Sequence, residues 1–425
     1  MFWFDFNWQI QNLLLQFWWP INLLLLVVAG LILFLAYKKT TYALGLIIIL
    51  LPTYLFRSNI GFLPFTYLEL IFWLTFLGWL TSLIKQKRKP EISLTYLWPM
   101  ILIFIASLIG LLIAPGLKTA AGLWKAYFFE PILFFFIAYD SIKDKKDKNV
   151  ILWALGISGL FISLLAIYQK FTGFAIVEPG WTAVTNRRVT SIFTSPNAVG
   201  LFLAPITTIY IGWLISGFKK ILPSIIKTII IILNLLAIIF TVSQGTCLGL
   251  AAAIIFLIFF GWSKKWTSTI IILLILIALL TPLSRNKIMP VLTLQDQSGQ
   301  NRLLLWQSGY NYLINSPTNF VLGAGIFGFQ KIFNQTRDPL KIEALLYPHN
   351  IILNFWLEIG LVGLIGFIWL IIYFFKIGTI KISQEKWLTL GIMAAMVTIV
   401  VHGLIDVPYF KNDLAILFWL IISLL

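Results

Sequence analysis

The sequence predicts an all-α membrane protein. We expect a polytopic transmembrane bundle of about 12–13 helices, with a long, partly helical outer loop before the last helices. The chain is 60% hydrophobic and only 11% charged, a composition that soluble domains of this size do not have. Apolar runs of roughly 16–22 residues recur from Ile21 to Leu425, about the length that crosses ~30 Å of hydrocarbon. No composition break marks a soluble domain, so residues 1–425 should form one integral membrane domain.

The first 20 residues precede these runs and differ from a secretion signal. They contain no lysine or arginine, and the first basic residue is Lys38, whereas a cleavable signal peptide begins with a basic region. They mix tryptophan and phenylalanine with asparagine and glutamine. This mixture is typical of the membrane–water interface, so residues 1–20 are predicted to form an interfacial segment.

Thirteen apolar runs are predicted to be helices. They lie near 21–37, 41–56, 62–84, 94–113, 121–139, 150–169, 196–216, 224–242, 244–261, 267–283, 350–375, 386–405 and 411–425. Every odd-numbered connection up to the eleventh is basic, and together these connections hold 18 of the 31 lysines and arginines, beside five acids. Basic loops stay in the cytoplasm. The net charge of +16 therefore indicates topology, and no nucleic-acid partner is expected.

Two connections on the predicted outer side are long. One is the first long outer loop, residues 170–195, and the other is the large outer loop, residues 285–348. Long connections of this kind are usually functional or disordered. Within the second, the stretch 301–316 has the pattern of an amphipathic helix that Pro317 ends.

Three glycines in the second loop match the spacing GxGxxG, at Gly323, Gly325 and Gly328. A dinucleotide site would need a preceding strand within a βαβ unit. An outer loop of a membrane protein does not supply one, so we interpret these glycines as a tight turn.

Three polar motifs lead into odd-numbered runs, whose first residues should face outward. They are "NRRVTSIFTSPNAVG" at 186–200, "TVSQGTCLG" at 241–249 and "YPHNIILN" at 347–354. In the first, Ser195 followed by Pro196 fits a helix N-cap with proline at the first helical position. Helix N-termini present free N–H groups and a partial positive charge. Three of them on one membrane face predict an anion site at the outer leaflet.

Arginines accompany these motifs. Arg187 and Arg188 precede the first helix start, and Arg302 opens the loop helix. Arginine stays charged and forks two hydrogen bonds onto phosphate. Taken singly, each could bind a lipid headgroup, but together with His349 they favour a substrate site.

His349 is the best acid–base candidate, because histidine titrates near neutral pH. The alternative is a loop histidine hydrogen-bonded to backbone. His402 and Asp406 lie four residues apart at the outer end of run twelve, and a structural hydrogen bond between them is predicted.

Glu358 follows His349 by nine residues. On a continuous helix it lies about two and a half turns, or roughly 13 Å, deeper and on the opposite face. A carboxylate within the membrane faces protein and pairs with another group. Lys125 and Glu130 in run five are also intramembrane, and Lys125–Glu358 is one candidate pair. Glycines at 360, 363 and 366 would let another helix approach closely.

Metal ligands do not converge in the sequence, which has no D-x-D, no H-x-x-x-H and no cysteine cluster. A metal centre needs several such groups together. We therefore expect a mechanism without metal, and no cofactor.

Four stretches in order resemble the O-antigen ligase and O-antigen polymerase superfamily of bacterial membrane glycosyltransferases. They are "RVTSIFTSPNAVG", "SQGTCLGL", "RLLLWQSGYNYLINSPTNFVLGAGIFGF" and "PHNIILNFWLEIGLVGLIGF". The resemblance implies an enzyme of the cytoplasmic (inner) membrane with its active site on the outer face. It implies a glycan donor linked to undecaprenyl diphosphate, a saccharide or lipid-linked acceptor, and contact with membrane lipid.

The resemblance also implies roles for individual residues. His349 matches the essential histidine, with Asn350 beside it, and is expected to take the proton of the acceptor hydroxyl in an inverting displacement. Arg188 and Arg302 match arginines that hold the diphosphate, and Asn197 is placed in the same set. Glu358 and Gly360 match the E-x-G of the following helix.

One departure concerns Gln244, because the family often has arginine there. This leaves one diphosphate contact open, which Arg187 could supply. A polymerase with the same donor and a protein-glycosylating member remain alternatives. A membrane transporter is the alternative from another class. It would place polar sites at the midplane with repeat symmetry, whereas the polar motifs here gather at one face.

Overall fold

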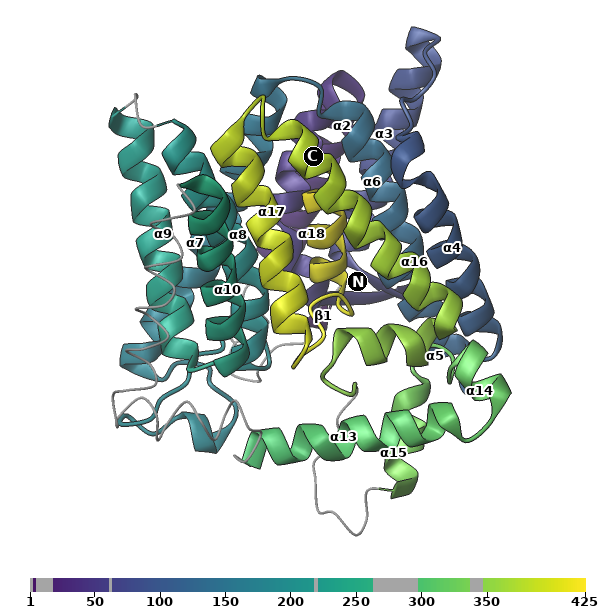
Figure 1. Cartoon of the computed structure of the whole chain (residues 1–425). Helices are drawn as coiled ribbons and strands as arrows, with labels where there is room; N and C mark the ends of the chain where they lie inside the picture. The colour runs from purple at the N-terminus through teal and green to yellow at the C-terminus, as the bar shows by residue number, and fades with distance from the viewer. Residues whose placement is uncertain (1–2, 5–17, 61–62, 218–220, 263–296, 337–346) are drawn as a thin grey trace.

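Most of the chain is described by a computed structural model, shown in Figure 1. The described residues are 3–4, 18–60, 63–217, 221–262, 297–336 and 347–425. Ten of their helices are long and apolar enough to cross a membrane, so the predicted all-α polytopic class is confirmed. The predicted run 267–283, most of the 1–20 segment, and 285–296 and 337–346 of the long outer loop lie outside the described residues.

The spans follow the predicted runs with small shifts at their ends. Nine spans are single helices: α2 (Trp18–Ile49), α3 (Tyr67–Gln86), α4 (Leu94–Leu112), α7 (Lys145–Thr172), α8 (Pro196–Ser216), α9 (Ile221–Thr241), α10 (Gln244–Gly261), α16 (Ile351–Lys381) and α17 (Lys386–Gly403). The tenth span lies between α4 and α7 and is continuous through α5 (Leu117–Trp124), the π-helix η2 (Lys125–Phe129) and α6 (Glu130–Ser141).

The first two predicted runs are joined in α2. Lys39 has the non-helical angles φ −154° and ψ 96°, so α2 consists of two helical segments that meet there. The count of ten spans treats them as one. This junction, the run outside the described residues and a short last helix explain why ten spans are found where thirteen runs are predicted.

A small antiparallel sheet was not predicted. Its strands are β1 (Trp3–Phe4), β2 (Phe56–Ile60) and β3 (Leu63–Thr66), and Arg57 pairs with both Trp3 and Thr66. The third run therefore begins at Tyr67 rather than near 62. The reason is a capping box: Thr66 Oγ1 accepts from the Glu69 N–H at 3.2 Å, and the Glu69 carboxylate accepts from the Thr66 N–H at 3.0 Å. A 3₁₀ turn, η1 (Leu51–Leu55), links α2 to β2.

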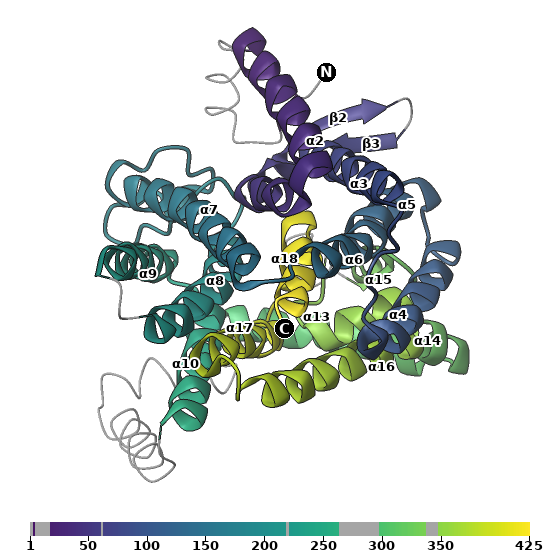
Figure 2. The ribbon, with the colours of Figure 1, turned by 90° about the horizontal axis from the view of Figure 1, so that it is seen from above.

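The last predicted run is not a full span. Helix α18 (Asn412–Ser423) has 12 residues, too few to cross a bilayer of about 30 Å. Every residue of α18 after Asn412 is buried, and Figure 2 shows the helix in the middle of the bundle. A helix that is apolar on all sides is stable when protein surrounds it. Here α18 packs against α6, while α16 packs on α4, and α17 packs on α8 and α10.

The basic connections meet at one end of the bundle. Ion pairs join them to the few acids of the same connections: Lys39 to Asp147 at 3.0 Å, Arg88 to Asp140 at 2.6 Å, Lys145 to Glu385 at 2.8 Å, and Lys143 to Glu91. Four connections far apart in the sequence are thus brought together, as a common membrane side requires. The basic residues at 219, 220, 264 and 265 lie outside the described residues.

Three helices cover the opposite end, at the bottom of Figure 1: α13 (Gln297–Ile314), α14 (Pro317–Leu322) and α15 (Gly328–Thr336). The helix predicted at 301–316 is present as α13, and Pro317 begins α14 instead of only ending the helix before it. The layer has its own apolar cluster, which contains Leu305, Leu313, Phe329, Phe333 and Leu357.

Helix α16 is broken, which corrects the predicted position of Glu358. Ile359 (φ −131°, ψ 16°) and Gly360 (φ 71°, ψ −179°) are non-helical. The depth and face predicted for Glu358 assumed a continuous helix and are therefore wrong. In Figure 1 the light green first part of α16 lies across the lower end of the bundle, and the second part rises through it.

Gly360 makes this break sterically possible. Its φ of 71° is disfavoured for other residues, and a Cβ there would lie 2.5 Å from the Val321 carbonyl oxygen. We predict that Gly360→Ala destabilises the protein by about 1–3 kcal/mol or more, seen as a lower Tm of the purified protein in detergent. Gly30→Ala is the control, because a Cβ at Gly30 has no neighbour within 4 Å. Equal Tm values for the two variants would contradict this account.

Candidate functional site

A histidine and a carboxylate form the centre of the site. His349 Nδ1 lies 3.1 Å from Asp406 Oδ1. The imidazole is 27% exposed, whereas Asp406 is buried. His349 precedes Asn350, the N-cap of α16. Its φ of 51° lies in the left-handed region, which few residues other than glycine adopt. Such backbone strain is concentrated at functional positions.

Asp406 is held from several directions. Asn197 Nδ2, in the first turn of α8, donates to Asp406 Oδ2 at 3.1 Å, and the Val407 N–H donates to Oδ1 at 2.8 Å. Burial by itself would raise the pKa of Asp406, but the nearby His349 and these hydrogen bonds hold it well below its usual range. Asp406 is therefore an ionised acceptor for the Nδ1–H of His349.

The predicted hydrogen bond between His402 and Asp406 is wrong. Asp406 lies in the 404–411 loop after α17 ends, where it turns toward His349. His402 is buried, and both its ring nitrogens lack a hydrogen-bond partner within the described part of the chain. It packs instead against the start of α10, where a Cβ at Gly245 would lie 2.6 Å from the His402 ring.

Three helix starts surround the 404–411 loop. Ser195 caps α8 by accepting from the Ala198 N–H at 3.3 Å, and Asn350 caps α16 by accepting from the Leu353 N–H at 3.0 Å. Ser243 stands at the N-cap of α10 without a side-chain cap bond. The starts of α8 and α10 touch, since any side chain at Gly200 would overlap Thr246. Their partial positive charges add at this end of the bundle.

Arg302 and Arg188 are each anchored through one nitrogen. Arg302 Nε donates to the Ile405 carbonyl at 3.1 Å, and Arg188 Nε donates to the Thr241 carbonyl at 2.9 Å. The two terminal nitrogens of each guanidinium make no hydrogen bond to another described residue. Burial lowers the pKa of Arg188, a cost that a bound anion would offset. Both arginines are thus oriented through Nε, and Arg188 also lies 5.7 Å from the centre of the Trp181 ring. Terminal guanidinium nitrogens are the donors that bind an anion end-on.

Arg187 is used differently. It is only 8% exposed, and it donates from Nε to the Thr182 carbonyl at 3.1 Å and from Nη1 to the Lys170 carbonyl at 2.9 Å. Lys170 is in the last turn of α7, so Arg187 satisfies a carbonyl at a helix end. These contacts indicate a structural role for Arg187.

The two asparagines expected to bind diphosphate also contact protein. Asn197 holds Asp406, and Asn350 Nδ2 donates to the Leu404 carbonyl at 3.0 Å. Both therefore fix the 404–411 loop and the histidine beside it.

The intramembrane polar residues have found other partners than expected. Lys125 Nζ pairs with Glu69 Oε2 at 2.9 Å rather than with Glu358, and Glu130 accepts from Trp73 Nε1 at 2.8 Å. Glu358 Oε2 accepts from the Phe327 N–H at 2.8 Å, and its Oε1 has no partner among the residues described. Glu358 therefore holds a loop of the outer layer.

That loop contains the GxGxxG glycines, which form a tight turn as expected. Gly323 and Gly325 have φ values of 76° and 78°. The turn hydrogen-bonds to two helices: the Ala324 N–H donates to the Leu357 carbonyl at 2.7 Å, and the Ile326 N–H donates to the Gly110 carbonyl at 3.0 Å. Because the break in α16 deprives the Leu357 carbonyl of its helical partner, Ala324 replaces that partner.

The role of Asp406 was missed by sequence reasoning. It lies 57 residues from His349, and its spacing from His402 suggested a local pair. The only available signal was a carboxylate in an outer connection, the same side as His349.

The fold and the site define a multi-pass membrane protein with a histidine–carboxylate pair and oriented arginines at one end of its bundle. Residues 229–368 match the protein-family model described as O-antigen ligase. This confirms the resemblance to the O-antigen ligase and polymerase superfamily. The matched region includes Arg302, His349 and Glu358, whereas Asp406 lies beyond it. No curated protein matches the chain. The family match supports a membrane glycosyltransferase-like ligase or polymerase that acts on a lipid-linked glycan.

The two neighbouring arginines give a matched test. We predict that Arg187→Ala lowers the stability of the purified protein by about 1–3 kcal/mol, because two partly buried carbonyls lose their donor. Arg188→Ala should lower the Tm less, because it removes one side-chain hydrogen bond. Thermal unfolding in detergent compares them, and a larger loss in Arg188→Ala would refute this assignment of roles.

Proposed function

We propose that the protein transfers a glycan from an undecaprenyl-diphosphate carrier to an acceptor hydroxyl at the outer face of the cytoplasmic membrane. The observation that carries the proposal is the His349–Asp406 pair, 3.1 Å apart, at the meeting point of three helix starts. A polymerase that uses the same donor and a lipid-linked glycan as acceptor has the same chemistry and is the second candidate.

His349 acts as the base. The ionised Asp406 accepts the Nδ1–H, which leaves the lone pair of Nε2 available for the proton of the acceptor hydroxyl. Asp406 also stabilises the imidazolium that forms. A positioned base of this kind contributes roughly 10²–10⁴ in rate.

The arginines and helix starts stabilise the leaving group. The acceptor oxygen forms a bond to the anomeric carbon while the bond from that carbon to the diphosphate oxygen breaks, and the electron pair stays on the lipid diphosphate. Arg188, Arg302 and the helix N–H groups would bind the growing negative charge, with each donor contributing about 3 kcal/mol in a dry site. Attack from the side opposite the diphosphate inverts the anomeric centre.

The topology supports an outer-face site. The basic connections and their ion pairs lie at the end of the bundle opposite the 404–411 loop (Figure 1). If that basic end is cytoplasmic, as the charge bias predicts, His349 faces the outer leaflet, where a flipped lipid-linked glycan is accessible.

Two single replacements test the base. His349→Ala and Asp406→Asn should each lower the transfer rate at least about 10²-fold, because one removes the base and the other allows the wrong tautomer. The rate is measured with purified protein, a lipid-diphosphate oligosaccharide and an acceptor, with product mass as readout. Glu178→Gln, at an exposed position of the 173–195 connection, is the control. Normal product from His349→Ala would disprove the catalytic assignment.

A charge-preserving replacement tests the arginine fork. Arg302→Lys keeps the positive charge but loses the planar pair of donors, so transfer should fall about tenfold or more. Arg88→Lys, at the opposite end of the bundle, should leave the rate unchanged. If both variants transfer normally, diphosphate is not held by a fork at Arg302.

The same assay separates an enzyme from a transporter. A transporter would deliver the lipid-linked glycan unchanged, whereas the proposed reaction releases lipid diphosphate in equal amount to the new glycosidic bond. The break in α16 resembles the broken helices of transporters, but a loop at the site end satisfies its freed Leu357 carbonyl.

A further inference from the structure

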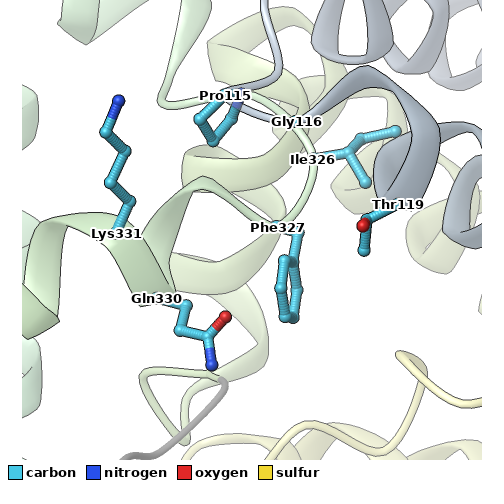
Figure 3. A pocket seen from close by; sticks show the side chains of 7 residues that line it. All are labelled: Pro115, Gly116, Thr119, Ile326, Phe327, Gln330 and Lys331. Carbon is cyan, nitrogen blue, oxygen red and sulfur yellow. The ribbon is translucent and has the colours of Figure 1, made fainter.

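A cavity of about 440 Å³ opens beside the outer layer, on the side of the bundle away from Arg188. Its walls come from the α4–α5 turn and from the start of α15. The lining residues are Pro115, Gly116, Thr119, Ile326, Phe327, Gln330 and Lys331 (Figure 3). The volume is within the range of small-molecule sites, roughly 300–1,000 Å³.

The lining combines one aromatic ring with three polar side chains. Figure 3 shows Phe327 between Gln330 on α15 and Thr119 on α5, while Lys331 extends from α15 in the direction opposite to Gln330. Within the described part of the chain, Thr119, Gln330 and Lys331 make no side-chain hydrogen bond or ion pair. No described residue thus occupies the hydroxyl, the amide or the ammonium, each of which can bond to a ligand.

Phe327 is held in a strained conformation. Its φ is 64°, a region that bulky residues rarely adopt without support. The support is Glu358, whose buried carboxylate accepts the Phe327 N–H at 2.8 Å. The neighbouring Ile326 N–H bonds to Gly110 of α4. Strain maintained by surrounding contacts is typical of ligand sites, and here it sets the ring at the cavity wall.

The cavity and Arg188 lie toward opposite sides of the bundle, because Arg188 bonds to the end of α9 whereas α5 and α15 form the cavity wall. Helices α8 and α10, which bring Asn197 and the helix starts, are on one side of Figure 2, and α4, α5 and α15 are on the other. Glu358 connects Phe327 to the region of the histidine, since its carboxylate accepts the Phe327 N–H. Glu358 also lies near Tyr347, whose pKa is raised by burial and further by the nearby Tyr127 and Glu358. Tyr347 is two residues before His349.

We propose that this cavity is the subsite for the acceptor saccharide, with Phe327 as the stacking surface and Lys331 as the contact for an anionic substituent. The inference rests on the proposed function, in which the acceptor attacks from the side opposite the diphosphate. Sugar rings place an apolar face on aromatic rings and bond their hydroxyls to amides and hydroxyls, as Phe327, Gln330 and Thr119 allow. The expected acceptor class is an oligosaccharide that bears a carboxylate or phosphate.

Steady-state titrations of the full-length protein test the subsite. The probe is the acceptor glycan isolated from a host strain that lacks this protein, used intact or after its anionic groups are esterified or removed. The double variant Gln330→Ala/Lys331→Ala should raise the KM for intact acceptor about tenfold or more, since two contacts are lost. The KM for donor and the maximum rate at saturating acceptor should stay within about twofold of wild type. Removing the anionic groups from the acceptor should raise its KM for the wild-type protein but not for the double variant.

Phe327→Leu and Lys118→Ala complete the set. Phe327→Leu keeps the apolar volume and loses the ring face, so acceptor KM should rise, whereas Lys118 in α5 does not line the cavity and its replacement should change nothing. Saturation-transfer NMR with the soluble acceptor glycan provides a binding readout that is independent of turnover.

The outcomes separate the two proposals. The subsite alone would be overturned if the double variant kept its acceptor KM and its NMR contacts while His349→Ala was inactive. A rise in donor KM instead would also overturn it, since the cavity would then hold the donor glycan. Full activity of His349→Ala would overturn the proposed function itself.

Discussion

The arrangement of the site depends on the break in α16 and on how its backbone is satisfied. A free carbonyl within a membrane protein costs several kcal/mol unless another donor reaches it. The Ala324 N–H reaches the Leu357 carbonyl at 2.7 Å, and Gly360 accepts the required backbone angle. One turn of the outer layer thereby fixes the first part of α16. Because His349 and Glu358 lie at the two ends of that part, the same turn positions both residues.

The 404–411 loop connects this first part of α16 to the other half of the bundle. Asn350 and Arg302 bind its carbonyls, while Asn197 and His349 bind its carboxylate Asp406. Three elements distant in sequence, α8, α13 and the start of α16, thus converge on eight residues of backbone. Their hydrogen bonds hold the loop beside His349, whose proposed role as a base requires a fixed tautomer.

Several features were accessible from the sequence because they depend on local pattern or on total composition. Apolar runs determined the spans, the basic connections determined which ends lie together, and the predicted N-cap residue Ser195 lies where a helix begins. His349 and Arg302 were selected because few residue types perform their chemistry. The GxGxxG glycines form the predicted tight turn, with positive φ at Gly323 and Gly325.

The tertiary structure alone decided which polar groups meet. His349 contacts Asp406 instead of a backbone group, and Lys125 pairs with Glu69 instead of Glu358. Arg187 bonds to a carbonyl at a helix end. Helical periodicity could not predict these contacts, because hydrogen bonds depend on distances between segments that are far apart in the sequence. Glu358 was misplaced for the same reason: residue spacing converts to depth only along an unbroken helix, and the break at Gly360 is set by Val321 and Leu322 of another segment. The sequence by itself determined the bundle and the chemistry it carries, and long-range packing determined the geometry.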